Sequence, residues 1–505
     1  MRAGLAGVAA AAAGLGLGEV VAAFIGPQSS PLLAVGGVVV DTVPGPVKDF
    51  GIAVFGTHDK TALITGTMVL LAGYAAAVGM AALRSWVLAL GGVALFTVIG
   101  VVAALTRHDA GLAAAVPSLV AGLVAATALR YLIALAASVS SPDAPVAAPP
   151  PLDGGRRRFL VGVGIAAAVG AVGGFGGRYL TSRRAVTAAR QAVVLPPPAQ
   201  PPPPIPPGAQ VPGATAYVTS AADFYRIDTS LYPPQVDPAS WQLHIHGMVR
   251  NPLTITWEQL LQRPMVSRYV TLACVSNDVG GDLIGNALWL GTPIKALLDE
   301  AQPLPEADQV VSRSVDGWTC GTPASVLRDG RDALLAIGMN GRPLPVPHGF
   351  PVRMVVPGLY GYVSACKWIT EIELTRFADF DAYWVPRGWS AQAPIKTQSR
   401  IDTPRDGARR KPGTVTIAGV AWAQHRGITK VEVQVDAQPW ATATLAPAVS
   451  ADTWVQWSHQ WQATPGDHTL RVRATDADGQ TQTSTRASPA PDGATGWHTV
   501  QITVE

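Results

Sequence analysis

Five long apolar stretches near the N-terminus constrain the fold of this chain more than any other feature of its sequence. They cover about residues 3–25, 61–83, 86–106, 111–137 and 159–177. Each is close to the roughly 20 residues with which a helix crosses a hydrocarbon core of about 30 Å. They are rich in glycine and alanine, which suits close helix packing in lipid. We therefore expect a five-helix transmembrane bundle over residues 1–180.

The arginines beside these stretches predict the side of the membrane that each loop faces. Arg2 precedes the first stretch, Arg84 separates the second from the third, and Arg156-Arg157-Arg158 precede the fifth. All of them lie on one side if the N-terminus is cytoplasmic. Residues 27–60 and everything after residue 178 are then outside. The expected location is the cytoplasmic (inner) membrane, with the soluble part extracytoplasmic.

Two features of the bundle leave alternatives open. Residues 155–160 and the apolar run after them resemble a twin-arginine export signal, although they lie inside the chain; positive-inside anchoring alone is the other reading. Glu19 is the one carboxylate inside a stretch, and both a functional role and a role in helix packing fit it. The bundle could also be a quinone-linked partner domain rather than an anchor. Glu19 is the only residue in the sequence that points to this alternative.

Residues 181–213 form a proline-rich linker in this reading. Ten prolines occur between residues 195 and 212, and such a run favours polyproline II of about 3.1 Å per residue, or roughly 55 Å. We expect a stalk that lifts the following domain away from the bilayer.

Two soluble domains are expected after the linker. Residues 214–395 mix short strands with short helices, among them a strand at 241–247, a helix at 292–300 and a buried strand at 352–356, and this mixture indicates an α+β domain. Residues 396–505 are dominated by strands with regular turns, which favours an Ig-like β-sandwich. Four tryptophans are expected to fill or border its core: Trp440, Trp454, Trp457 and Trp461.

Several classes of function are not supported. The net charge of +3 comes from scattered arginines, whereas nucleic-acid binding needs a concentrated basic face. No glycine-rich dinucleotide fingerprint follows a strand, so nicotinamide or flavin binding is not indicated. His244 and His246 share one face of a strand, and without further ligands nearby we expect a structural role for both.

Cys274 is the principal candidate for chemistry. It follows a β-type run, and a lone thiol there is a soft ligand that can hold a transition metal as thiolate. His348 and Arg353 stand five residues apart in a Gly/Pro-rich turn and are the side chains one would place against a phosphate. The other two cysteines, Cys320 and Cys366, either form a disulfide or are buried thiols.

These segments, from about Phe224 to Glu373, resemble the molybdopterin-binding domain of the sulfite oxidase family. The resemblance implies a Mo-molybdopterin cofactor, with Cys274 as the catalytic protein ligand of the metal and Arg226 facing the metal pocket. It also implies a set of residues that contact the pterin, its amine or its phosphate: Phe224, Tyr225, Arg226, Asp316, His348, Arg353, Ser364, Ala365, Cys366 and Lys367. Residues 396–505 resemble the C-terminal dimerisation domain of the same family, so a homodimer is possible.

The chain departs from the sulfite oxidases around the substrate. Those enzymes follow the ligand cysteine with Ala-Gly-Asn-Arg-Arg, whereas Val275-Ser276-Asn277-Asp278-Val279 stand here. The active-site tyrosine that they carry has no match near Pro386–Trp389. A dianion such as sulfite is therefore not expected. Trp289, Trp389 and Tyr383 are expected to line a pocket for a larger or neutral substrate.

The sequence thus predicts a membrane-tethered molybdopterin-dependent oxidoreductase that performs two-electron oxygen-atom transfer on a small oxo or sulfur substrate. An S-oxide, as in the related periplasmic methionine sulfoxide reductases, and a small oxo-anion are the candidates. No haem motif is present, so electrons must pass to a separate carrier, a cytochrome or a quinone-linked one. The alternative is a non-catalytic sensor or binding ectodomain on a degenerate sulfite-oxidase fold.

Overall fold

The computed structural model describes residues 1–26, 29–43, 54, 59–107, 110–137, 154–183 and 186–505. They divide into two compact units. One holds Met1–Ala185 together with Thr229–Tyr232, and the other holds Val186–Asp228 and Pro233–Glu505.

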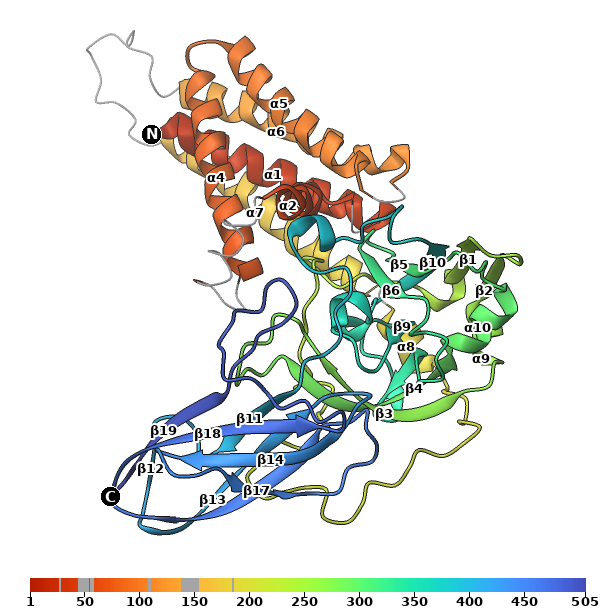
Figure 1. Ribbon diagram of the computed structural model, residues 1–505. Coiled ribbons are helices and arrows are strands. Elements are labelled where there is room, and N and C mark those ends of the chain that lie inside the picture. The colour runs from red at the N-terminus through yellow and green to blue at the C-terminus, as the bar shows by residue number, and fades with distance from the viewer. Residues whose placement is uncertain (27–28, 44–53, 55–58, 108–109, 138–153, 184–185) are drawn as a thin grey trace, which may run out of the picture. The chain divides into compact units, whose positions relative to one another are not determined.

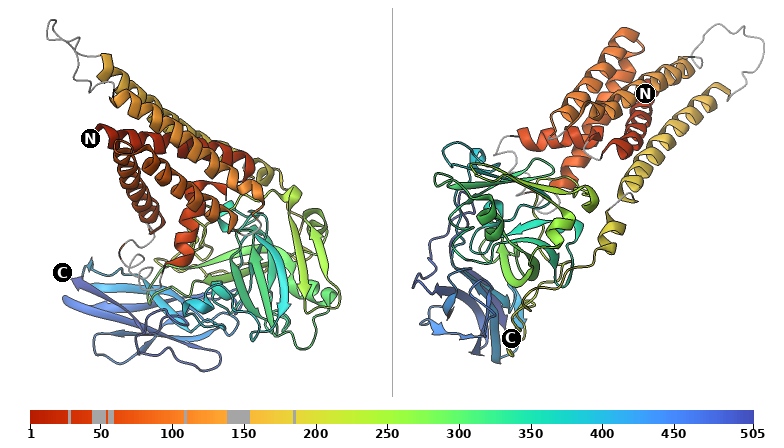
Figure 2. Two further views of the ribbon diagram at one scale, coloured as in Figure 1. Left: turned by 90° about the horizontal axis from the view of Figure 1, so that it is seen from above. Right: turned by 90° about the vertical axis from the view of Figure 1, so that its right-hand side faces the viewer.

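The first unit is a helical bundle around α1 (Arg2–Ile25), which contacts three other long helices (Figures 1 and 2). Small residues allow this packing: a Cβ atom on Gly7 would lie 2.0 Å from the carbonyl oxygen of Ala75. Besides α1, the described helices of the unit are α2 (Pro31–Thr42), α4 (Asp59–Ala81), α5 (Trp86–Leu105), η3 (Leu112–Ala115), α6 (Val116–Ala137) and α7 (Gly154–Arg183).

The five expected apolar helices are present. By length and composition, Arg2–Ile25, Ala62–Ala81, Trp86–Leu105, Leu112–Ala137 and Gly155–Gly177 are each able to cross a membrane. The additional helix α2 lies in the stretch expected outside, much of which falls outside the described residues. Glu19 is buried and accepts a 2.6 Å hydrogen bond from the Ser30 hydroxyl. This bond gives one oxygen of the buried carboxylate a partner inside the bundle, which agrees with a role of Glu19 in helix packing.

The proline-rich segment packs along the second unit, so the expectation of a free-standing stalk is wrong. After the short helix α8 (Thr187–Ala192) the chain is irregular. The Ala199 amide donates to the Met265 carbonyl over 2.7 Å, and the Val211 amide donates to Gln456 Oε1 over 2.6 Å. Ala209 is fully buried. Proline lacks an amide hydrogen but leaves the residues between free to donate, and these amides find acceptors on the neighbouring domain.

Two sheets form the α+β part of the second unit. The first has the order β2 (Leu253–Thr256), β1 (Gln242–Gly247), β10 (Ile369–Thr375), β5 (Gln309–Ser314), β6 (Thr319–Pro323), with β1 and β10 parallel. The second has the order β3 (Val266–Ala273), β4 (Ile284–Pro293), β7 (Leu334–Met339), β8 (Arg342–Pro343), and β9 (Arg353–Val355) pairs with β7. The connecting helices are η4 (Pro238–Ser240), α9 (Trp257–Leu261), α10 (Ile294–Ala301), η5 (Val346–His348), η6 (Gly361–Val363) and η7 (Val385–Arg387).

Local sequence explains several of these elements. In β1, Leu243 and Ile245 are fully buried while Gln242 and His244 are exposed, which is the period of two expected for a half-buried strand. Helix α9 begins with a capping box between Thr256 and Gln259. The expected helix at 292–300 begins two residues later, because residues 292–293 still pair with β7.

Residues 398–504 form the expected sandwich of two sheets (Figure 1). Trp457 fills its core, whereas buried Trp454 belongs to the core of the α+β part, since its amide donates to Thr271 Oγ1 in β3 over 2.8 Å. The sheets contain β11 (Gln398–Thr403), β13 (Gly413–Trp422), β17 (Val455–Ala463) and β16 (Thr444–Leu445), and β12 (Ala408–Arg410), β19 (His498–Val504), β18 (Gly466–Asp476), β14 (Ile428–Val435) and β15 (Ala441–Thr442).

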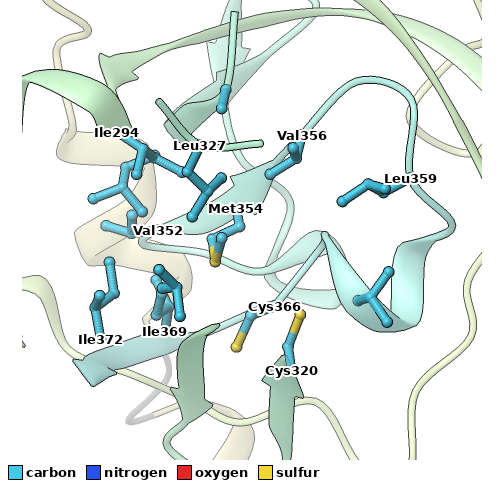
Figure 3. Packing of buried hydrophobic residues seen from close by; sticks show 14 of the residues in the cluster. Ile294, Cys320, Leu327, Val352, Met354, Val356, Leu359, Cys366, Ile369 and Ile372 are labelled. Atoms are coloured by element: carbon cyan, nitrogen blue, oxygen red, sulfur yellow. The ribbon is translucent and has the colours of Figure 1, made fainter. Parts of the chain in front are cut away.

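Cys320 and Cys366 are free, fully buried thiols in this structure. Figure 3 shows both side chains in the same apolar layer as Met354 and Ile369. Burial raises the pKa of each thiol, and the pKa of Cys320 rises to about 12. Both side chains therefore pack as small apolar groups, one of the two expected alternatives.

Candidate functional site

Cys274 lies immediately after β3, at the start of the loop that returns to β4. Its amide donates to the Leu283 carbonyl over 2.9 Å, and its own carbonyl accepts a 3.1 Å hydrogen bond from the Asn277 amide. The side chain is 8% exposed, so the thiol sits in a shallow, nearly enclosed position. A strand end followed by a tightly bonded loop gives the sulfur a fixed direction.

Opposing effects act on the thiol of Cys274. Burial raises its pKa. Hydrogen bonds from the backbone and side chain of Ser276 and from the Val275 amide lower it, as does the positive charge of Lys367. These groups would stabilise a thiolate once a cation replaces the proton. The exposed Ser276 was not identified from the sequence, although its place two residues after the ligand candidate was a usable signal.

Arg353 is the most unusual charge in the described part of the chain. It is 5% exposed, and no carboxylate of the described residues lies within ion-pair distance. Its guanidinium donates to the carbonyls of His348 and Met354, each over 3.2 Å, and lies 4.9 Å from the ring of Trp289. Burial lowers its pKa to about 10. A buried cation held only by carbonyls and a ring calls for an anion.

His348 lies beside this guanidinium as a neutral imidazole. Burial, followed by the charge of Arg353, lowers the pKa of His348 to about 4. Its Nε2 lies 2.8 Å from the Ala221 carbonyl oxygen. Because a carbonyl only accepts, Nε2 carries the proton and Nδ1 keeps its lone pair. His348 therefore offers an acceptor, and the positive charge of the site comes from its neighbours.

Lys367 and Arg226 share one carboxylate. Lys367 Nζ lies 2.8 Å from Asp228 Oδ2, and Arg226 Nε lies 3.2 Å from the same oxygen. The lysine and aspartate side chains are 11% and 5% exposed, while that of Arg226 is 38% exposed. Asp228 was not identified from the sequence. Its position orients Lys367 toward the centre, where the ammonium lowers the pKa of both Cys274 and His348.

An aromatic group closes one side of the site. The buried ring of Phe224 stacks on Tyr225 at 5.2 Å and meets His348 edge-on at 5.7 Å. Gly285 makes room for it, because a Cβ atom there would lie 2.7 Å from the Phe224 ring. Burial raises the pKa of Tyr225, and the nearby Cys274 adds to the shift, so the phenol stays protonated beside the sulfur.

The remaining predicted contacts lie in or beside the loop before β10. Ser364 is fully buried, and its hydroxyl donates to the carbonyls of Leu359 and Tyr360. Asp316, in the turn between β5 and β6, lies close enough to raise the pKa of Cys366. Ala365 and Cys366 then place their backbone between this turn and the Arg353 strand, which pairs with Lys367.

The three residues expected to line a substrate pocket have different surroundings. Trp289 is fully buried under Arg353, and its indole donates to the Val270 carbonyl over 3.1 Å, so it forms the floor of the site. Tyr383 lies 3.7 Å below the guanidinium of Arg387. The ring of Trp389 packs against that of Tyr362, with 5.8 Å between the ring centroids.

The residues fit a cofactor with an anionic tail and a metal that brings most of its own ligands. Arg353 supplies a buried cation without a carboxylate, and His348 and the backbone at 364–367 supply acceptors and donors around it. Among the described residues no three His, Cys, Asp or Glu side chains gather as a metal site. A single thiolate, Cys274, therefore suits a metal carried by a dithiolene.

Comparison with known proteins gives the same assignment for this region. Residues 230–384 match the oxidoreductase molybdopterin binding domain, and residues 398–472 match a bacterial Ig domain. The chain is 28% identical to sulfite oxidase of Gallus gallus over 44% of its own length and 59% of that protein. It is 29% identical to mitochondrial sulfite oxidase of Homo sapiens over 42% and 46%, respectively. It thus spans about half the length of these curated relatives.

A solved structure supports the fold. The sulfane dehydrogenase SoxCD from Paracoccus pantotrophus is similar with a TM-score of 0.50 and 22% identity, over 58% of this chain and 84% of that one. At this identity the similarity shows the fold alone.

Proposed function

Because residues 230–384 belong to the molybdopterin-binding domain of the sulfite oxidase family, we propose that the chain is a membrane-tethered oxidoreductase. It performs two-electron oxygen-atom transfer on a small oxo or sulfur substrate. The family implies a Mo-molybdopterin cofactor. The domains are residues 1–180 for the bundle, 181–213 for the linker, 214–395 for catalysis and 396–505 for the Ig-like part.

The single observation that carries this proposal is the buried guanidinium of Arg353. Leaving a buried charge unpaired costs several kcal/mol, and no carboxylate of the described residues offsets it. The phosphate tail of the cofactor is the anion that fits, because a planar guanidinium matches phosphate geometry. The ring of Trp289 packs against the guanidinium of Arg353 and fixes its position.

Each residue of the site has a separate role toward the cofactor. Cys274 supplies one sulfur ligand, and Ser276 and Lys367 favour its thiolate form. His348 Nδ1 would accept a hydrogen bond from an N–H or O–H group of the pterin, since Nε2 is engaged by Ala221. The Asp316 carboxylate would accept a hydrogen bond from the pterin amine. When bound, the cofactor supplies the two-electron redox chemistry, and the protein supplies orientation and electrostatics.

The substrate is a neutral S-oxide or a weakly charged oxo compound rather than sulfite. Of the cationic cluster expected around a dianion, the chain keeps Arg226, which already pairs with Asp228. Asp278 stands where a sulfite oxidase has a cation and is exposed to solvent. A partly screened Arg226 binds a dianion weakly, whereas a sulfoxide oxygen needs only a single donor.

The five apolar helices favour attachment to the cytoplasmic membrane with the catalytic domain outside. A cofactor domain that folds before export agrees with the twin-arginine reading of residues 155–160. Electrons then pass to a separate carrier, a cytochrome or a quinone-linked protein. A homodimer through residues 396–505 is part of this proposal, because they resemble the dimerisation domain of the family.

The test uses the full chain, purified in detergent from a host that makes the cofactor. We expect one molybdenum per chain by elemental analysis and the fluorescence of oxidised pterin after denaturation. Arg353→Met should retain less than about a tenth of the pterin, since a charge-assisted contact to phosphate is lost. Arg313→Met, which breaks a pair with Glu371 outside the site, is the control and should retain all of it.

Cys274→Ser separates the metal from the pterin. This variant should lose reduction of sulfoxides by an artificial electron donor and most of its molybdenum. If wild-type chain from a cofactor-producing host contains neither molybdenum nor pterin, the enzymatic proposal is wrong and a binding or sensor ectodomain takes its place.

A further inference from the structure

The loop that carries Cys274 is held from inside by one amide side chain. Residues 275–283 connect β3 to β4, and Asn277 is 8% exposed beneath them. The backbone amide of Leu283 donates to the side-chain oxygen Oδ1 of Asn277 over 2.8 Å. The backbone amide of Asn277 donates to the Cys274 carbonyl over 3.1 Å. Asn277 therefore ties the end of the loop to its start.

The same loop is also gripped from the Ig-like domain. Arg400 in β11 donates from Nη1 to the Gly281 carbonyl over 2.8 Å. Its Nε donates to Asp402 Oδ1 over 2.6 Å, and the two side chains are 11% and 12% exposed. Asp402 is held in turn, since its Oδ2 accepts a 2.9 Å hydrogen bond from the Thr215 amide. The guanidinium is thus aimed at one carbonyl by a fixed carboxylate.

A histidine of β19 completes the contact. The ring of His498 lies against Gly280, where a Cβ atom would come within 2.2 Å of the ring. The Ile401 amide donates to His498 Nδ1 over 2.9 Å and fixes the ring plane. At the next position, a Cβ atom on Gly281 would lie 2.6 Å from Asn277 Oδ1. Both glycines are needed because the loop is pressed between His498 and Asn277.

We propose that Arg400 is a positioning residue for the metal-ligand loop, so that the Ig-like domain forms part of the catalytic site. The Arg400–Asp402 pair, with His498 beside it, holds residues 280–281 and thereby the direction of the Cys274 sulfur through Asn277. Its consequence for turnover rests on the proposed function. We call the contacts of Arg400, Asp402 and His498 with residues 280–281 the clamp. These contacts are made by the polypeptide alone and do not need the cofactor.

The first experiment measures the clamp in cofactor-free protein. The full chain from a host unable to make molybdopterin is treated in detergent with iodoacetamide, and mass spectrometry follows alkylation of each cysteine. Arg400→Met should raise the alkylation rate of Cys274 about tenfold, the effect of one charge-assisted hydrogen bond. Cys320 and Cys366, which are fully buried, should stay unreactive and report that the core is intact.

Arg471→Met is the matched control. Arg471 lies in the same sandwich and donates to Gln434 and to the Asp436 carbonyl, neither of which belongs to residues 274–283, so this variant should leave Cys274 at the wild-type rate. If Arg400→Met unfolds the chain, Asp402→Asn replaces it, because it keeps Arg400 and removes the carboxylate that aims it. We then expect a rise of about threefold.

Equal alkylation of Cys274 in the wild type and in the folded Arg400 or Asp402 variant would overturn the proposal, whatever the chain binds. In cofactor-loaded protein, Arg400→Met should lower kcat with little change in KM and should shift the absorption band of the metal–thiolate bond. If neither the wild type nor any variant binds molybdenum, the proposed function is wrong. The positioning role of Arg400 is then still tested by the alkylation rates.

Discussion

At the scale of single residues, the site combines a buried cation, which has no acidic partner among the described residues, with a histidine that stays neutral. Arg353 and His348 lie five residues apart, and the 3.2 Å bond from the guanidinium to the His348 carbonyl binds them together. The guanidinium charge helps burial to keep the imidazole unprotonated. Each residue type was recognisable in the sequence, but the protonation state and tautomer of His348 follow from Ala221 and Arg353 around it.

The lowered pKa of His348 predicts an acid-sensitive domain. The pKa is about 4 in the folded chain and about 6.5 in an unfolded one. The stabilising effect of the neutral form is therefore complete above pH 6.5 and is lost as the pH falls toward 4. The loss is about 3 kcal/mol at most.

This dependence is measurable in cofactor-free protein as the midpoint of thermal unfolding between pH 7 and pH 4. His348→Gln keeps a donor for the Ala221 carbonyl and cannot be protonated, so its midpoint should fall less steeply than that of the wild type. His498, whose pKa is also lowered to about 4, remains in both proteins and cancels in the comparison. Parallel curves would contradict the assignment.

At the scale of elements, the proline-rich segment shows how a local pattern and its tertiary setting differ. Ten prolines favour an extended chain whether it stands in solvent or lies on a surface. The deciding partner is Gln456, a fully buried residue of β17 that accepts from the Val211 amide and donates to the Thr215 carbonyl over 2.7 Å. No pattern in residues 195–212 signals a glutamine some 250 positions later.

Limited proteolysis tests whether the segment is docked. With a protease of broad specificity, we expect cleavage between residues 205 and 215 to be slow in the wild type and about tenfold faster in Gln456→Ala, which loses two buried hydrogen bonds. Gln462 lies in the same strand as Gln456, and Gln462→Ala removes only its exposed hydrogen bond to Thr414 of β13, so this variant should not change the rate. Fast cleavage of the wild-type segment would restore the picture of a free stalk.

At the scale of the whole molecule, a helical unit of low polarity is joined to a unit that contains the α+β domain and the β-sandwich. The second unit is continuous across its two domains, since Trp454 of the sandwich region packs in the α+β core. Gln424 adds a 2.9 Å hydrogen bond to the Thr271 carbonyl in β3, and Arg400 reaches the Cys274 loop. The Ig-like domain therefore contacts both the α+β core and the Cys274 loop within one chain.

The proposed topology predicts which parts are reached from outside the cell membrane. Alkaline phosphatase fused after Glu505 should be active, and a fusion after Arg84, in the turn between the second and third apolar helices, should be inactive. Substituting Arg156, Arg157 and Arg158 with lysine should abolish export of the C-terminal fusion only if the twin-arginine reading is correct. An inactive fusion at Glu505 in the wild type would place the catalytic domain in the cytoplasm.

Apolar length, proline density, strand alternation and the residues around Cys274 are local features. They suffice to predict five apolar helices, an α+β domain, a sandwich and the family of the cofactor domain. Contacts between distant segments depend on how the chain folds, and no local pattern predicts them. The pairing of Lys367 with Asp228, the burial of Trp289 beneath Arg353 and the reach of Arg400 to Gly281 each join positions more than 60 residues apart. Their energies depend on burial and on hydrogen-bond geometry, which arise only when the sheets pack against each other.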